Sequence, residues 1–495
     1  MGTRTPNDRL RRAIHEAGCT YAEIARDVRS VAAESGGRTR TNSSAVAHWV
    51  AGTRPSATTA RALTEALARR LGRALVPEQL GLHAPGYDTS SGGADADAGD
   101  GGTAAGPGSP GDGSFATGGG GLGEDPVAAL TRLTRDDLAG RTETVRAAYA
   151  VALAAVPPHR AEEVAARAGV VGTAGGGARA GAGDVAAARA MLELFTLADE
   201  RHGGRHGASA VVQYLHSDVA AFCRARFRSE TQRRQMLTTA GCLAYLAGWK
   251  AYDGNRPGLA QRYYLRALAF ARAAGEPAHE AFVLRVMAHH GMECGRPEHT
   301  VQLMDAALER LGTRADPASA SLYAATRARA FAVQGRRREA IAESSRALRL
   351  GEGADERALP YWAALWGSSA PCVRNHLGKA AAALGEPALA EAHFARAEWS
   401  SGGGGAQRRI AALSLAHTGA MQCRQGKVER ACTTWGHALE LTEGVRSARL
   451  VDAVTRMRTE LAPLRLRGAR AALDFDARAR DWLADVTTDG RGTPG

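Results

Sequence analysis

Lysine is nearly absent from this chain of 495 residues, and aromatic side chains are few. Three of the 63 basic residues are lysine (Lys250, Lys379 and Lys427), and Phe, Trp and Tyr make up 5% of the chain. No apolar run approaches the ~18 residues that a transmembrane helix needs, and the opening residues lack the apolar segment of a signal peptide. We therefore expect a soluble, cytoplasmic protein with no membrane partner.

Motifs for metal binding and catalysis are also missing. The seven cysteines form no CxxC pair and no close Cys/His cluster, which supports neither a zinc site nor a secreted disulfide framework. Gly378-Lys379 lacks the upstream glycine of a phosphate-binding loop, and no GxSxG elbow occurs. The stretch DERHGGRHG (199–207) has too few ligands for a metal and predicts a tight turn between helices. We expect reduced thiols, and no enzyme activity, catalytic residue, metal site or cofactor.

Positive charge is concentrated near the N-terminus. The whole chain carries a formal net charge of +12, although an Arg-rich, Lys-poor composition is also what a GC-rich genome produces. Residues 1–83 contain 13 arginines, no lysine and seven acidic residues, a net charge of +6. Such local excess is typical of a segment that meets an anionic partner.

A low-complexity segment separates two parts of the chain. Residues 84–124 are rich in Gly, Ala and Asp and have almost no large apolar side chains, so they cannot offset the entropy lost on ordering. We predict a disordered linker there, with a domain over 1–83, hereafter the head, and a second domain over 125–495. The rest of the chain has helical periodicity and little β-branched alternation, which predicts an all-α fold.

A spacing pattern occurs five times within residues 240–445. Each unit starts from a small residue, Gly or Ala, which we call the anchor. Asn or Gly follows seven positions later, and small residues follow at +12 and +19. The residue at +16 is aromatic in three of the five units. The anchors are Gly248, Ala288, Ala328, Gly378 and Gly419, separated by 40, 40, 50 and 41 residues. Asn and Gly tolerate the left-handed conformation that ends a helix, so the pattern predicts a helix, a tight turn and a second helix.

This unit resembles the tetratricopeptide repeat, stretched to about 40 residues from the usual ~34. The resemblance implies an α-solenoid, hereafter the solenoid; a nonrepetitive helical bundle is the alternative. In tetratricopeptide proteins the residues three before and one after the anchor line a concave groove. In the five repeats these two positions are occupied by Tyr245 and Trp249, Arg285 and His289, Ala325 and Arg329, Asn375 and Lys379, and Ala416 and Ala420. The resemblance thus makes Tyr245, Trp249, Arg285, His289, Arg329, Asn375 and Lys379 candidates for holding a carboxylate ligand, a peptide or a protein partner, unless they are simply solvated cations.

The head has the pattern of a small helical bundle. Helices are expected over 7–17, 20–28, 42–52 and 58–72, with a polar segment after the second and a capping box at Thr20 to Glu23. Four short helices with a net positive charge fit a helix-turn-helix domain whose third helix enters the major groove, although a purely structural module is the alternative. Val46, Trp49 and Val50 would face the core. The candidate base readers are Arg40, Thr41, Ser44, Ala47 and His48, and the candidate phosphate contacts are Arg38, Arg54 and Arg61.

Three stretches of the head, TPNDRLRRAIHEAGCTYAEIARDV, SAVAHWVAGTRP and LARRLGRALVPEQLGL, resemble the helix-turn-helix heads of actinobacterial, streptomycete-type regulators that also carry tetratricopeptide repeats. DERHGGRHGASAVVQYLHSDV and LAYLAGWKAYDGNRPGLAQRYYLRAL resemble the repeat part of the same family. The resemblance implies regulation of antibiotic production and sporulation. It also shows a departure, because relatives tend to be basic where this chain has Ala47-His48.

Together these features predict a transcriptional regulator that binds promoter DNA. A homodimer is expected because one small helix-turn-helix unit rarely reaches useful affinity, whereas two tethered copies gain effective concentration. A small molecule, peptide or protein in the solenoid would control it. The alternative is a tetratricopeptide adaptor that captures other regulators and does not bind DNA specifically.

Overall fold

In the computed structural model the described part of the chain is helical almost throughout. The structure describes residues 5–34, 38–82, 125–141, 148–154, 178–312, 315–355, 359–365, 369–397 and 408–489. It divides into two compact units, Met1–Gly119 and Gly120–Gly495, and the predicted linker at 84–124 lies outside the described residues. The described strands are β1 (Arg179–Ala180) and β2 (Arg226–Phe227), a short parallel pair. The predicted all-α fold is confirmed.

The described part of the head is a bundle of short helices. They are α1 (Asp8–Glu16), α2 (Tyr21–Glu34), α3 (Ser43–Val50), α4 (Ala57–Leu71) and the 3-10 helix η1 (Pro77–Leu80). α3 packs against α1 and α2, and α4 packs against α2. Val46, Trp49 and Val50 are at most 8% exposed, so the predicted inner face of α3 is confirmed.

Side chains at the helix starts bind backbone N–H groups that have no partner inside the helix. Asn42 caps α3 by accepting a hydrogen bond from Ala45 N at 2.9 Å. The predicted capping box precedes α2: Thr20 N donates to Glu23 Oε2 at 2.8 Å, and Glu23 N donates to Thr20 Oγ1 at 3.3 Å. Local sequence therefore determines where the second and third helices begin.

α2 is longer than predicted. The sequence predicted a helix over 20–28 followed by a polar segment, whereas α2 ends at Glu34. Val31 and Ala32 are buried and continue the apolar stripe of the first half of the helix, so the helix extends along the core. The connection to α3 then covers 35–42, longer than the roughly three or four residues of an ordinary helix-turn-helix turn.

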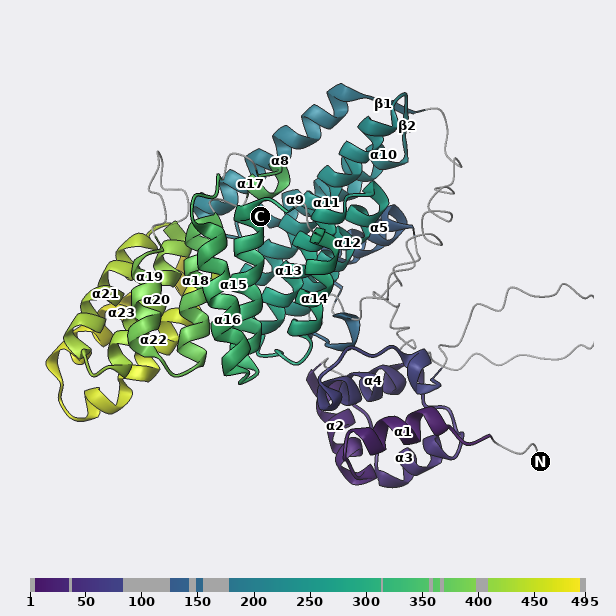
Figure 1. Cartoon of the computed structure of the whole chain (residues 1–495), viewed down its shortest axis with the longest axis horizontal. Helices are drawn as coiled ribbons and strands as arrows, with labels where there is room; N and C mark the ends of the chain where they lie inside the picture. The colour runs from purple at the N-terminus through teal and green to yellow at the C-terminus, as the bar shows by residue number, and fades with distance from the viewer. Residues whose placement is uncertain are drawn as a thin grey trace, which may run out of the picture. The chain divides into compact units, whose positions relative to one another are not determined.

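The solenoid consists of successive helix pairs, each packed against the next (Figure 1). The pairs are α11 (Glu230–Asp253) with α12 (Pro257–Ala274), α13 (Pro277–Glu293) with α14 (Thr300–Leu311), α15 (Pro317–Val333) with α16 (Arg337–Gly351), α18 (Ser369–Ala383) with α19 (Pro387–Ala395), α20 (Arg408–Arg424) with α21 (Val428–Leu441), and α22 (Ala448–Leu466) with α23 (Arg470–Asp489). The short α17 (Tyr361–Ala364) lies between the third and fourth pairs. The elements before the pairs are α5 (Pro126–Leu138), η2 (Ala152–Ala154), α8 (Ala182–His202), α9 (Ala208–Tyr214), η3 (Leu215–Val219) and α10 (Ala220–Arg224).

The turn within each predicted repeat has the expected backbone conformation. Its φ angle is positive in all five: Asn255 (58°), Gly295 (67°), Gly335 (75°), Gly385 (77°) and Gly426 (78°). Asn255 is the only residue other than glycine with a positive φ in the described chain. The predicted unit of helix, tight turn and helix is confirmed.

The small anchors allow the two helices of a pair to approach closely. A β-carbon added to Gly248 would lie 2.7 Å from the ring of Tyr264, and one added to Gly378 would lie 2.5 Å from the ring of Phe394. These rings stand sixteen residues after their anchors, as the repeat predicts. The spacing in the sequence thus corresponds to a direct contact between the helices.

Two details differ from the predicted repeat. Pro257 and Pro387 open the second helices of their pairs, but α14 begins at Thr300, three residues after Pro297, and Thr300 N and Oγ1 donate to Pro297 O at 3.1 and 2.8 Å. The sixth pair, α22 with α23, was not predicted. Its turn residue Gly468 has a positive φ of 77°, but its anchor position is Leu461, so the small-residue signature is absent.

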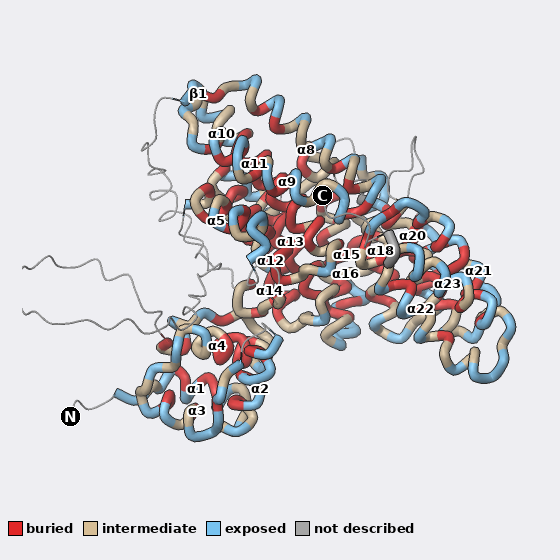
Figure 2. Tube along the Cα trace, turned by 180° about the vertical axis from the view of Figure 1, so that it is seen from behind, coloured by how far each residue is buried: buried red, intermediate tan, exposed pale blue. Residues whose placement is uncertain are grey.

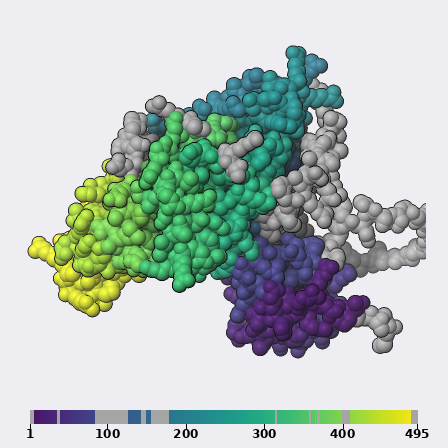
Figure 3. Space-filling model, in the orientation of Figure 1, coloured from purple at the N-terminus to yellow at the C-terminus, as the bar shows by residue number. Residues whose placement is uncertain are grey.

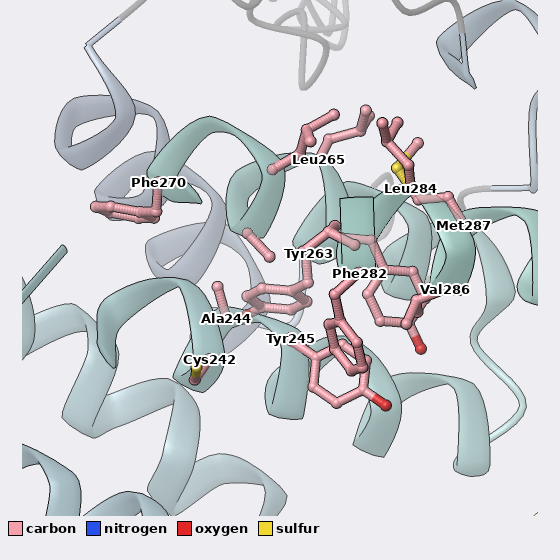
Figure 4. Packing of buried hydrophobic residues seen from close by; sticks show 14 of the residues in the cluster. Cys242, Ala244, Tyr245, Tyr263, Leu265, Phe270, Phe282, Leu284, Val286 and Met287 are labelled. Atoms are coloured by element: carbon pink, nitrogen blue, oxygen red, sulfur yellow. The ribbon is translucent and has the colours of Figure 1, made fainter. Parts of the chain in front are cut away.

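The core runs through the inside of the solenoid, where buried residues predominate (Figure 2). In its first pairs, the ring of Tyr245 on α11 lies edge-on to that of Phe282 on α13, with centroids 5.5 Å apart (Figure 4). Tyr263 and Phe270 of α12 are fully buried beside them. On the face shown in Figure 3 the helix pairs form a continuous surface.

Candidate functional site

The predicted DNA-contacting residues lie on or beside α3, and most of them reach solvent. Arg38, Arg40, Ser44, His48 and Arg54 are exposed, while Ala47 and Arg61 are half-buried. The exposed outer side of α3 therefore presents the hydroxyls of Ser43 and Ser44 and one imidazole, and the arginines lie in the segments on either side of the helix.

Thr41 is placed differently from its prediction as a base reader. It is 4% exposed, and its Oγ1 lies 2.8 Å from Thr39 Oγ1. Its carbonyl accepts a hydrogen bond from Arg29 Nη1 of α2. Thr41 therefore holds the segment before α3 in place and does not present its side chain to a partner.

Ion pairs in the head are distributed unevenly. The arginines at the end of α4 and just after it all have acidic partners: Arg69 with Glu34 (2.7 Å) and Glu65 (2.6 Å), Arg70 with Asp27 (2.8 Å), and Arg73 with Glu16 (2.9 Å). Arg38, Arg40 and Arg54 form no ion pair with any described residue. The uncompensated positive charge of the head thus includes the arginines that flank α3.

The predicted groove residues of the solenoid are largely enclosed. They lie on the first helices of the pairs: Tyr245 and Trp249 on α11, Arg285 and His289 on α13, Arg329 on α15, and Asn375 and Lys379 on α18. Tyr245, Arg285 and Arg329 are at most 9% exposed, and the other four are half-buried. The structure brings them together as a polar interior, whereas the sequence suggested an open groove.

A carboxylate that was not predicted lies at the centre of this interior. Glu293 Oε1 forms an ion pair with Arg329 Nη1 at 2.8 Å and accepts a hydrogen bond from Lys379 Nζ at 2.6 Å, and Glu293 Oε2 accepts one from Tyr252 Oη at 3.2 Å. Arg329 Nη1 also lies 3.4 Å from His289 Nδ1. We call these five residues the Glu293 cluster. It joins α11, α13, α15 and α18 through charge-assisted bonds.

Burial and charge set the protonation states of this cluster. Burial would raise the pKa of Glu293, but Lys379 and Arg329 hold it well below its ordinary value. Burial lowers the pKa of Lys379 to about 8 against the attraction of Glu293, and burial lowers the pKa of His289 well below its usual range. At neutral pH the cluster therefore contains two cations, one carboxylate and a neutral imidazole.

A second buried network ties α8 to distant helices. Asp199 on α8 pairs with Lys250 on α11 (3.2 Å) and with Arg409 on α20 (2.6 Å). Arg409 Nη1 also lies 3.3 Å from Asp253 Oδ2, and Ser447 Oγ donates to Asp253 Oδ1 at 2.8 Å. We call these five residues the Asp199 cluster. It places α8 against both the first and the fifth helix pairs, with which it is in contact.

Asp199 stays ionised despite its burial. Burial would raise its pKa, but Arg409 and Lys250 together lower it below the ordinary value. The side chains of Asp199, Lys250, Arg409 and Asp253 are at most 4% exposed. Removing one member of such a network leaves the others charged and unpaired, which is strongly destabilising.

The sixth pair also reaches back to the first. Arg449, near the start of α22, lies 5.4 Å from the ring centre of Trp249 and 4.6 Å from that of Tyr252. Cation–π contacts of this kind supply an attractive partner for a guanidinium away from water. Arg449 therefore joins α22 to the aromatic residues Trp249 and Tyr252 of α11.

A pocket occurs on the inner side of the last pairs. Its lining includes Ala416 and Ala420, two of the predicted groove positions, together with His417, Trp435 and Arg456. Burial lowers the pKa of His417 well below its usual range, and Lys379 adds to that effect. The pocket therefore lies near the cationic part of the Glu293 cluster.

Sequence reasoning missed three residues that organise the interior: Asp199, Glu293 and Arg409. Glu293 could have been found, because it follows His289 by one helical turn and so shares its face. Asp199 and Arg409 are separated by 210 positions, and no repeat signature connects them. The turn predicted at DERHGGRHG is confirmed: α8 ends at His202 and α9 begins at Ala208.

The described residues contain neither a membrane-spanning helix nor a metal cluster. No helix in the described ranges is long and apolar enough to cross a membrane. Among the same residues no group of three or more His, Cys, Asp or Glu side chains is arranged to hold a metal ion.

Comparison with family models gives a match in the head. A family model described as the SP15 N-terminal domain matches residues 10–83. No curated protein matches the chain. The matched stretch begins within α1 and continues past η1, so what this chain shares with that family is its N-terminal helical domain.

Proposed function

We propose that the protein is a DNA-binding transcriptional regulator whose head contacts promoter DNA and whose solenoid acts as a sensor or dimerisation domain. The observation that carries the proposal is the charge pattern of the head. Arg38, Arg40 and Arg54 flank an exposed helix and have no acidic partner among the described residues, while the arginines of the α4 end are neutralised. Free guanidinium groups beside a helix suit contacts with the phosphate backbone.

The exposed face of α3 suits limited reading of base edges. Ser44 and His48 can donate or accept hydrogen bonds, and Arg40 can make a bidentate contact with guanine. Ala47 can meet only a thymine methyl group. We expect phosphate contacts to supply most of the affinity and these side chains to supply a moderate sequence preference.

The biological role proposed here is control of secondary metabolism or development. It is supported by the resemblance of the head and of the repeats to streptomycete-type regulators of antibiotic production and sporulation. A homodimer would place two heads on one operator and increase affinity through effective concentration. Occupation of the solenoid would then act by shifting the population of binding-competent dimers.

The charge pattern can be tested by changing it. In the full chain, an Arg38/Arg40/Arg54 triple alanine variant should bind DNA more weakly. The slope of log K against log salt should become shallower by about 0.9 for each phosphate group that is no longer neutralised. A control triple, Arg11/Arg12/Arg73 to alanine, removes the same formal charge from two exposed positions on α1 and one half-buried position after α4. Equal weakening by both triples would show that only total charge matters and would contradict a specific α3 interface.

A protein-interaction adaptor is the second candidate. The observation in its favour is that the centre of the α3 face is Ala47, half-buried, with no Arg, Asn or Gln on the helix. An adaptor would bind DNA without sequence preference, or not at all, and would instead recover a partner protein through its repeats.

A further inference from the structure

The solenoid interior contains polar side chains that have no partner. Arg285 of α13, Tyr323 of α15, and Asn375 and His376 of α18 come from three consecutive first helices. None of the four forms a hydrogen bond or an ion pair with any residue that the structure describes. Arg285 Nε, Asn375 Oδ1 and His376 Nδ1 are also closed off from solvent. Buried polar groups are almost always satisfied, so these three atoms on two helices point to a missing partner.

Arg285 is the decisive member, because it is permanently charged and 9% exposed. Its neighbours in the interior, Arg329 and Lys379, share the carboxylate of Glu293, whereas Arg285 has no carboxylate. An isolated buried charge is costly unless it is paired. The carboxylate that would pair with it is absent from the described protein.

The ring of His376 on α18 lies 5.3 Å from the ring of His289, which follows Arg285 by one helical turn on α13. Burial raises the pKa of Tyr323, and the charge of Arg285 partly opposes that rise. Burial lowers the pKa of His376 well below its usual range, and the charge of Arg285 adds to that effect. The same charge reaches Tyr245 of α11. The charge of Arg285 thus acts on groups of α11, α15 and α18, and Asn375 is adjacent to His376 on α18.

Aromatic rings form one wall of this site. The guanidinium of Arg285 lies 5.1 Å from the ring centre of Phe282. Phe282 in turn packs against Tyr245 (Figure 4) and against Trp362, with ring centroids 5.5 and 5.4 Å apart. These rings suit an apolar or aromatic body joined to an anionic group.

We propose that Arg285, Tyr323, Asn375 and His376 form a binding site for a small molecule that carries a carboxylate next to an aromatic or apolar body. Arg285 pairs with both carboxylate oxygens, the Tyr323 hydroxyl donates to one of them, and the Asn375 amide orients the ligand. The enclosure of the site favours a small molecule over a peptide. This inference deepens the proposed sensor role of the solenoid, but binding itself requires no DNA.

The test is calorimetric titration of the full chain with benzoate, and with benzamide as a neutral probe of similar shape. Wild type should bind benzoate at least about tenfold more tightly than benzamide, and Arg285→Met should abolish that preference. Arg338→Met, which removes an exposed arginine from α16, should leave it unchanged. Tyr323→Phe removes only a hydroxyl and should weaken benzoate binding severalfold.

Thermal unfolding without ligand provides a second readout. Arg285→Met should melt at a higher temperature than wild type, because the substitution removes an unpaired buried charge. Failure of benzoate to bind more tightly than benzamide, or the same preference in wild type and Arg285→Met, would overturn the site. No DNA is present in either experiment, so a failure of the DNA-binding proposal would not affect these results, and loss of this site would leave that proposal intact.

Discussion

Gly419 of α20 lies directly against the indole ring of Trp435 of α21, sixteen residues later in the chain. The ring is fully buried, and its Nε1 donates a hydrogen bond to Ala416 O at 3.0 Å. The indole therefore cannot move away without losing both its packing and its hydrogen bond. The same pairing of a small anchor with a ring at +16 occurs between Gly248 and Tyr264 and between Gly378 and Phe394.

Gly419→Ala is expected to destabilise the solenoid despite the higher helix propensity of alanine. The new methyl group overlaps the Trp435 ring, and overpacking of this kind costs about 1–3 kcal/mol. Urea denaturation of the full chain measures the change. Gly183→Ala is the matched control, because its added methyl meets nothing within 4 Å and should be neutral or slightly stabilising. Equal stability of the two variants would show that the anchor contact is not limiting.

Glu293→Gln is expected to lower the free energy of unfolding by about 3–5 kcal/mol, because it leaves Arg329 and Lys379 without their shared carboxylate. The glutamine keeps the shape of the side chain, so the loss reports on charge. Glu309→Gln on α14, where the carboxylate is 65% exposed, should change stability by less than about 0.5 kcal/mol. A small effect at Glu293 would mean that the interior is well hydrated.

Lys379 should produce a pH-dependent contribution above neutrality. Burial lowers its pKa in the folded state to about 8, below the ordinary value of 10.5, so the unfolded chain binds this proton more tightly. By linkage, its contribution to stability is least favourable below about pH 8 and becomes more favourable as the pH rises toward 10.5. In urea denaturation from about pH 7 to about pH 10, wild type should gain stability relative to Lys379→Met. The exposed-lysine control Lys427→Met should run parallel to wild type, and parallel behaviour of Lys379→Met would contradict the shifted pKa.

Arg409→Leu should release α8 from the rest of the solenoid. The substitution leaves the buried carboxylates of Asp199 and Asp253 with Lys250 as the remaining cation of the Asp199 cluster, which favours local opening of the helix. Amide hydrogen exchange should become faster in α8 (Ala182–His202) than in α15. Arg408→Leu, at the neighbouring half-buried position, is the control. Unchanged exchange in α8 would show that its apolar contacts suffice to hold it.

Most of the repeat architecture could be predicted because it depends on short-range spacing. The positive φ at Asn255 and at four glycines, and the ring contacts of Gly248 and Gly378, follow from residue types seven and sixteen positions apart. The sixth pair was missed because Leu461 occupies its anchor. The predicted end of α2 was wrong because Val31 and Ala32 bury a helical face within a stretch that appears polar.

The interior of the solenoid could be predicted only in part. The position of Arg285, Arg329 and Lys379 on first helices follows from the repeat register. Their enclosure, and the carboxylate of Glu293 between two of them, depend on how tightly the pairs pack. The contact of Asp199 with Arg409 joins residues 210 positions apart, and local patterns carry no information about such long-range pairing.

DNA reading by α3 is tested most directly by using the purified full chain to select sequences from a randomised DNA library at low and high salt. The same selection is carried out with an Arg40/Ser44/His48 triple alanine variant. We predict that wild type enriches a defined motif at both salt concentrations. The variant should retain salt-sensitive binding but lose the motif, because phosphate contacts provide affinity and base contacts provide specificity. Absence of any enriched motif with wild type, or the same motif with the variant, would contradict the proposal that α3 reads DNA.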